Sequence, residues 1–168
     1  RPGSGVAVGS AYALACKGSL LGDRGLFAQA DECFAEALSL VGSSPHQVGA
    51  SVRGWVACVH MWQGQWEDAL RAANDGARIA EHVRSRQLLA ITRSLAGYSD
   101  WMLTQQPEAL QAVRDATAWI EERNGALFTS LCYGWLVDGE VSLGRMADAR
   151  RHAARLFVRA RQRERIGE

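Results

Sequence analysis

The chain has no run of apolar residues long enough to cross a membrane. Its longest apolar stretches are interrupted by Arg, Asp, Gln or Gly, whereas a membrane-spanning helix needs about 20 consecutive apolar residues. The remaining composition, with 48% hydrophobic and 22% charged residues in 168, is typical of a globular protein. We therefore expect a water-soluble, cytoplasmic protein without a membrane partner.

Cysteine is also scarce, and its pattern excludes two common kinds of small fold. The four cysteines, at positions 16, 33, 58 and 132, are too few for a disulfide scaffold and lack the C-x-x-C or Cys/His spacing of a zinc site. Cys16 and Cys33 could meet if the helices on either side of the turn at 22–25 run antiparallel. Free thiols in a reducing compartment are the simpler interpretation.

Sequence motifs of catalysis are absent as well. The chain has no G-x-x-x-x-G-K-[ST], no G-x-S-x-G and no H-E-x-x-H. Asp138 and Glu140 are two residues apart, so on a helix they point to different sides and make a poor acid/base pair. The histidines, at 46, 60, 82 and 152, are scattered along the chain. We predict that the protein is not an enzyme and uses neither a cofactor nor a metal.

A short pattern of glycine, a large apolar residue and alanine recurs along the chain. It reads Gly25-x-Phe27-x-x-Ala30, Gly64-x-Trp66-x-x-Ala69 and Gly144-x-Met146-x-x-Ala149, with a degenerate copy Thr104-x-Gln106-x-x-Ala109. The alanines are 39, 40 and 40 residues apart. A period in this range predicts stacked helical hairpins, because one hairpin cannot bury its apolar face alone. We refer to these four alanines as the anchor alanines.

Apolar periodicity predicts eight helices and no strand. The expected helices are 7–22, 27–41, 46–63, 66–83, 86–103, 107–122, 125–143 and 146–163. Pro45 and Pro107 suit a first helical turn, and the break near Ser85 has the weakest signal. The helices pair into hairpins 7–42, 46–83, 86–122 and 125–163 of a single domain, 6–168, after a linker or cloning remnant at 1–5.

The spacing of small residues supports these hairpins. Twelve residues before the anchor alanines lie Gly18, Ala57, Gly97 and Val137. A small side chain lets two helices approach closely, so the first three should face their alanines across the hairpin. The fourth copy departs from the pattern, and its helices should cross at a wider distance.

These residues resemble the tetratricopeptide repeat (TPR). The first copy matches the repeat at six places, namely Gly18, Gly25, Phe27, Ala30, Phe34 and Ala37. The resemblance implies an all-α, right-handed superhelix of four TPR-like hairpins. The usual repeat has about 34 residues; units of this longer period resemble the repeat domains of large bacterial regulators, both LuxR-family ATP-binding transcription factors of the maltose-activator type and class III cyclases with repeat tails.

The resemblance further implies a concave groove, lined by the first helix of each hairpin, that binds a peptide, a protein or a small effector. Rows counted back from the anchor alanines place small residues on its floor: Ala15, Gly54, Ser94 and Gly134. We expect apolar walls and one possible anchor for a cation: Met61, Trp62, Tyr98, Trp101 and Met102, with Asp138. The alternative is that such a stripe is packing between repeats, which is how we interpret Trp55, Trp66, Trp119 and Trp135.

Arginines crowd the last quarter of the chain, around a basic patch at Arg151, Arg155 and Arg159. We interpret this patch as a solvated helix face, because no base-reading motif accompanies it. The alternative function is binding of nucleic acid or an acidic partner. Residues 161–168 resemble the start of another repeat, so we expect a fragment of a longer array, whose bare final hairpin could pair with a second molecule. The predicted function is a non-catalytic interaction or effector-sensing module of a bacterial signalling or transcription regulator.

Overall fold

The computed structural model describes residues 5–42, 45–123 and 128–164. These residues form eight α-helices and no strand. The helices are α1 (Gly5–Asp23), α2 (Phe27–Val41), α3 (Gln47–Trp62), α4 (Trp66–His82), α5 (Arg86–Thr104), α6 (Ala109–Glu122), α7 (Thr129–Ser142) and α8 (Met146–Glu164). The predicted helices are confirmed. The linker at 1–4, the turn residues 43–44, the predicted start of the seventh helix at 125 and residues 165–168 lie outside the described residues.

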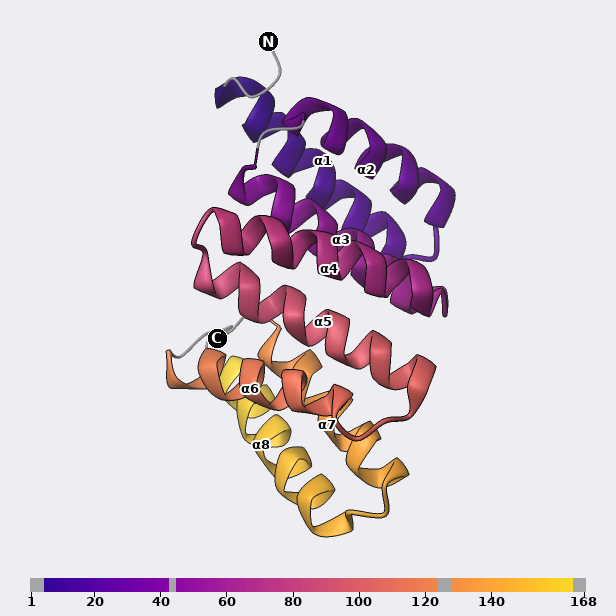
Figure 1. The fold of residues 1–168 in the computed structure, drawn as a ribbon, viewed down its shortest axis with the longest axis vertical. Helices are drawn as coiled ribbons and strands as arrows, with labels where there is room; N and C mark the ends of the chain where they lie inside the picture. Colours follow the sequence, from indigo (N-terminus) through magenta and orange to yellow (C-terminus); the bar gives the residue numbers. More distant parts are fainter. Residues whose placement is uncertain (1–4, 43–44, 124–127, 165–168) are drawn as a thin grey trace.

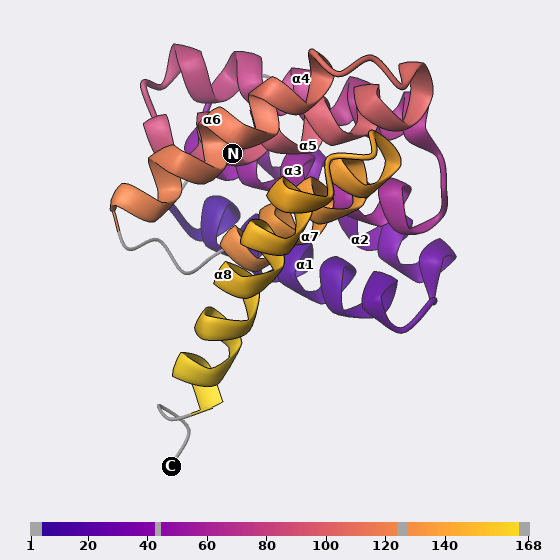
Figure 2. The same ribbon diagram turned by 90° about the horizontal axis from the view of Figure 1, so that it is seen from below.

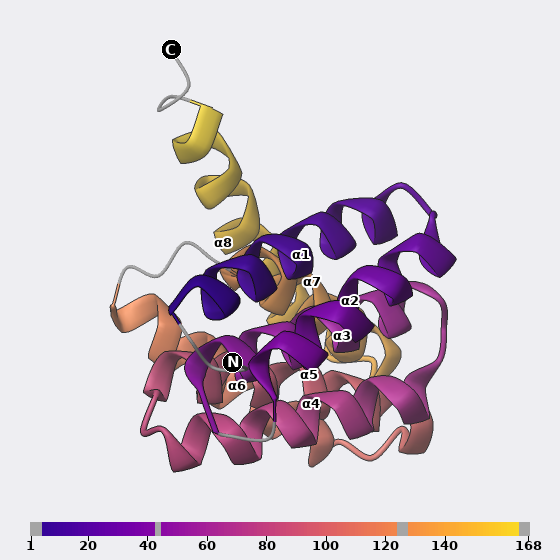
Figure 3. The same cartoon turned by 90° about the horizontal axis from the view of Figure 1, so that it is seen from above.

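The helices form antiparallel hairpins that stack along the long axis of the molecule (Figure 1). The second helix of each of the first three hairpins packs on the first helix of the next, as α2 does on α3, α4 on α5 and α6 on α7. First helices also contact one another, α1 with α3 and α3 with α5. The fold is therefore an all-α solenoid. The last turns of α8 extend away from the other helices (Figures 2 and 3).

The turn inside each hairpin explains the repeated glycine. Gly25, Gly64 and Gly144 adopt φ values of 75°, 72° and 71°, a left-handed conformation that is strained for residues with a Cβ atom. In the degenerate third copy Gln105 takes this role with φ 54°. Arg84, between α4 and α5, has φ 53°. A non-glycine residue at that position explains the weak sequence signal near Ser85.

The anchor alanines are buried between helices, as expected of packing positions. The predicted close approach is confirmed at Gly97, where a Cβ atom would lie 2.8 Å from the carbonyl oxygen of Ala109. At Gly18 the neighbour is different, because a Cβ atom would lie 2.8 Å from the ring of Phe34 rather than against Ala30. Pro107 precedes α6 instead of lying in its first turn.

Two clusters of buried apolar side chains make up the core. One spans α1 to α3, and the other spans α3 to α7. Trp55 of α3 packs against both clusters and so joins them. The cysteines are unpaired, as predicted. Among the described helices, none is long and apolar enough to span a membrane.

Candidate functional site: the inner face

The first helices α1, α3, α5 and α7 present a shared surface, which we call the inner face. Its most exposed apolar side chains are Tyr12, Trp62 and Leu131, each 44–49% exposed. Trp55 and Trp135 are half-buried beside them and pack against the core. Apolar surface at this density, supplied by aromatic side chains, is characteristic of binding surfaces.

One polar group on the inner face is held in place by aromatic neighbours. The Tyr98 hydroxyl of α5 donates a 2.8 Å hydrogen bond to Oδ2 of the exposed Asp138 on α7. The Tyr98 ring stacks on Trp135 at 5.3 Å between centroids and meets Trp66 edge-on at 6.2 Å. Burial, reinforced by the bond to Asp138, raises the pKa of Tyr98, so the phenol stays protonated and keeps donating. The carboxylate is thus oriented, and its Oδ1 accepts no hydrogen bond from the described residues.

A small apolar cavity of about 50 Å³ lies at the opposite ends of the same helices. Tyr12, Trp55, Leu88 and Phe128 are among its lining residues. The Phe128 ring is tilted against Trp55 at 5.4 Å between centroids, so the start of α7 approaches α3 across the inner face. The cavity suits a methyl group or a short aliphatic side chain.

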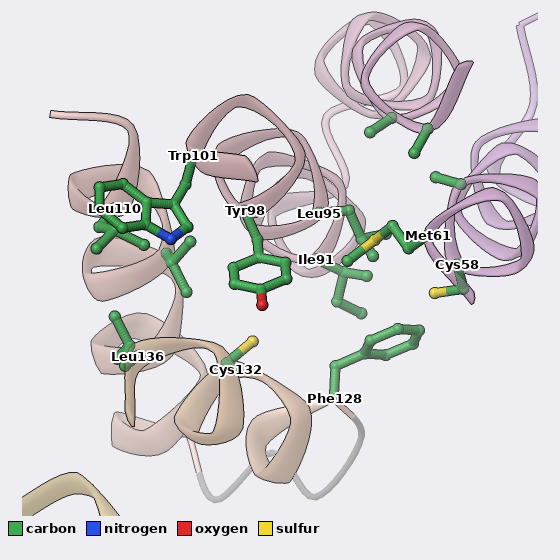
Figure 4. Packing of buried hydrophobic residues seen from close by; sticks show 14 of the residues in the cluster. Cys58, Met61, Ile91, Leu95, Tyr98, Trp101, Leu110, Phe128, Cys132 and Leu136 are labelled. Carbon is green, nitrogen blue, oxygen red and sulfur yellow. The ribbon is translucent and has the colours of Figure 1, made fainter. Parts of the chain in front are cut away.

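Two predicted groove residues lie in the core instead. Trp101 is 1% exposed and packs near Leu110 (Figure 4), and Met61 is also buried in this cluster. Both are eight residues before their anchor alanines. At internal junctions this row points between hairpins rather than onto the inner face, so packing is the correct interpretation for these two residues.

The other predicted groove residues are at or near the inner surface. Trp62 and Asp138 are exposed, and Met102 is half-buried at the end of α5. Tyr98 is buried but reaches the surface through its hydroxyl bond to Asp138. These residues stay candidates for binding.

The predicted small-residue floor is only partly open. Ala15, Gly54 and Ser94 are buried between first helices. A Cβ atom on Gly54 would contact Leu95 at 3.8 Å, whereas one on Gly134 would meet nothing within 4 Å. Free space along this row therefore lies over α7, close to Asp138 and Leu131.

Sequence reasoning missed Tyr12 and Leu131 as inner-face residues. Both are 18 residues before an anchor alanine, one row beyond those considered above. The anchor alanines do carry this signal, because counting back 18 residues places Tyr12, Ser51, Ile91 and Leu131 in one row.

The basic patch on α8 is paired within the molecule. Arg155 lies 3.0 Å from Glu121 Oε2 and also 3.3 Å from the hydroxyl of Tyr133. Arg159 is 3.8 Å from the same carboxylate, and Arg151 pairs with Asp148. These contacts offset much of the positive charge that a nucleic-acid surface would need.

No group that could ligate a metal occurs among the described residues. Glu140 and Asp138 point to different sides of α7, as predicted, since Glu140 is buried and Asp138 is exposed. Burial lowers the pKa of His152, which lies against the Tyr133 ring at 5.8 Å. We find no arrangement of nucleophile and base on the described part of the inner face.

The chain is similar in structure to a known bacterial protein. The crystal structure of aspartyl phosphate phosphatase F from Bacillus subtilis superimposes with a TM-score of 0.73 over 94% of this chain. The identity is 15%, and the match spans 42% of that protein's length; the likeness therefore concerns the fold alone. No protein-family model and no curated protein matches the sequence.

Proposed function

We propose that this chain is a non-catalytic binding module whose inner face holds a segment of a partner protein or a peptide. The observation that carries the proposal is the oriented carboxylate of Asp138 beside exposed apolar side chains. Tyr98 fixes one oxygen at 2.8 Å, and Leu131 and Trp135 belong to the same helix. A cationic side chain could bind the other oxygen while neighbouring apolar side chains cover the aromatic surface.

The shape of the site favours an extended chain over a compact small molecule. The apolar cavity near Tyr12 and Phe128 holds about 50 Å³, well below the roughly 300–1,000 Å³ of pockets that bury a drug-sized ligand. Asp138 and this cavity are contributed by different parts of the first helices. A peptide with an apolar side chain at one position and Arg or Lys at another could use both features.

The parent protein is, in our proposal, a bacterial signalling or transcription regulator. Support comes from the length of the repeat, 39 or 40 residues, which resembles the repeat domains of such regulators. In that setting the inner face would recognise a partner and the regulator's other domains would produce the response.

Selection from a random peptide library tests the proposed function. The purified chain should enrich peptides that combine aromatic or aliphatic residues with Arg or Lys, and excess selected peptide should protect Trp62 and Trp135 from fluorescence quenching by acrylamide. Failure to enrich any sequence, or enrichment of acidic peptides that bind α8, would overturn the proposal. Glu32→Arg is the matched control, because Glu32 is exposed on α2, outside the inner face.

A further inference from the structure

The N-terminal end of the solenoid exposes a face that is buried at each junction inside it. The residues 17 before the last three anchor alanines are at most 1% exposed: Val52, Thr92 and Cys132. Their counterpart in α1, Ala13, is exposed. Ten residues before the anchors, Leu20 is 65% exposed, whereas its counterparts Val59, Ser99 and Gly139 are buried. No described helix covers this face of α1.

The other end exposes the complementary face on α8. The residues 11 after the first three anchors are buried at junctions: Val41, Ala80 and Ile120. Their counterpart Ala160 is exposed. Eight residues after the anchors, Thr117 is buried while Phe157 is 68% exposed. A large aromatic side chain is costly to leave in water, so this face is suited to contact with another helix.

Contacts at internal junctions show how the two faces would meet. A Cβ atom on Gly76 of α4 would lie 2.9 Å from Thr92 Cγ2 of α5. The residues at the same repeat positions on the two ends are Leu156 of α8 and Ala13 of α1. A Cβ atom on Gly49 of α3 would likewise lie 3.1 Å from Val41 of α2.

The second of these contacts has its own counterpart at the ends, namely Ala160 of α8 against Ser10 of α1. Both end faces therefore present small or apolar residues where an internal junction has its closest contacts. One stacking geometry satisfies both pairs.

Charges at the ends are complementary in the same geometry. Inside the molecule Glu121 of α6, 12 residues after its anchor, pairs at 3.0 Å with Arg155 of α8, six residues after its own anchor. The equivalent residues at an end-to-end junction are Arg161 of α8 and Glu36 of α2, a pair with the signs exchanged. Both are exposed and form no ion pair with the described residues. The acidic residues of α2, Asp31, Glu32 and Glu36, have no basic neighbour on that helix.

We propose that a second copy of this chain stacks head to tail on the first, with α1 of one copy packed on α8 of the next. Phe157 and Ala160 would cover Leu20 and Ala13, and Arg161 would pair with Glu36 across the junction. Such an interface is heterologous and does not close on itself, so association continues beyond dimers as concentration rises. This inference is independent of the proposed binding function, because it uses the ends rather than the inner face.

Sedimentation velocity on the intact chain, Leu20→Glu and Phe157→Glu tests the stacking. Wild type should gain mass steadily between about 1 µM and about 500 µM. Each variant alone should stay monomeric, since one of its two faces is damaged. An equimolar mixture should form a one-to-one complex, because each variant keeps the face that the other has lost. Dimers of Leu20→Glu alone would show a symmetric contact through α8 and overturn the proposal, as would a monomeric wild type.

Charge exchange provides a second measurement with folded, exposed substitutions. Glu36→Arg should weaken association at least fivefold, and adding Arg161→Glu to the same chain should restore it. Glu32→Arg should have less than a twofold effect, because residues two after the anchor are exposed in all four copies. No recovery in the double variant would contradict the pairing. Leu131→Glu, which damages only the inner face, should leave association unchanged, so the two proposals fail separately.

Discussion

Arg114 of α6 and Glu140 of α7 form an ion pair whose carboxylate is almost completely buried. Nε and Nη2 of Arg114 donate to Oε1 of Glu140 at 3.1 and 2.5 Å, and the Glu140 side chain is 2% exposed. The other oxygen accepts no hydrogen bond within the described residues and lies 3.7 Å from Arg145. This pair joins the third hairpin to the fourth.

Removal of Arg114 should therefore destabilise the protein strongly. Arg114→Ala leaves the Glu140 carboxylate buried without its main partner, so we expect a loss of about 3 kcal/mol in the free energy of unfolding. Arg151→Ala, at a largely exposed ion pair, should cost less than about 1 kcal/mol. Urea denaturation measures both. The pair would not have the assigned role if the two variants lost equal stability, whereas near wild-type stability of Arg114→Met with Glu140→Leu would support it.

Substitution of Trp101 should report on the core and not on ligand binding. Trp101→Ala is expected to cost about 3–5 kcal/mol through cavity formation. Trp101→Phe should cost much less, because the indole Nε1 has no hydrogen-bond partner among the described residues and its loss relieves an unpaired donor. Denaturation curves of the two variants decide the matter. Equal losses would mean that Nε1 is paired in solution.

The turn between α4 and α5 should tolerate glycine better than arginine. Arg84 has φ 53°, so Arg84→Gly should raise the free energy of unfolding by about 0.5–1 kcal/mol through relief of left-handed strain. Arg84→Ala removes the same side chain but keeps a Cβ atom, and should give no gain. Thermal unfolding of the three proteins provides the comparison. A gain of equal size in the alanine variant would assign the effect to charge.

Stability should fall in alkaline solution because of Cys58. Burial, and then the nearby Cys132, raises the pKa of the Cys58 thiol from 9.0 to about 12. Between these values the unfolded thiol loses its proton while the folded one keeps it. The free energy of unfolding therefore falls with rising pH, by at most about 1.4 kcal/mol per unit from this group. Urea titrations from pH 8 to pH 11 should show a shallower fall in Cys58→Ala; an unchanged slope would contradict the assignment.

Local rules were sufficient to predict the helices and hairpins. Glycine at a left-handed turn and alanine at a close crossing have specific steric causes, and both lie within one repeat. Phe128 and Pro107 show where such rules stop. Phe128 precedes α7 with φ 64° and packs on Trp55, a contact across two hairpins that no pattern within one repeat encodes.

The binding residues were harder to predict for a related reason. Neighbouring rows on a helix differ by about 100° in direction, and the stacking of hairpins decides which row faces water. Trp101 and Leu131 are both apolar, yet one is 1% and the other 44% exposed. Spacing within a repeat placed both on first helices but did not separate core from surface.

Isothermal titration of a library-selected peptide into wild type, Leu131→Glu and Asp138→Asn tests the binding proposal most directly. Circular dichroism should show all three proteins equally helical, because both substituted side chains are exposed. The account predicts at least a tenfold loss of affinity in each variant, about 1.4 kcal/mol or more, and no loss in Glu32→Arg. Unchanged affinity in both inner-face variants would contradict it.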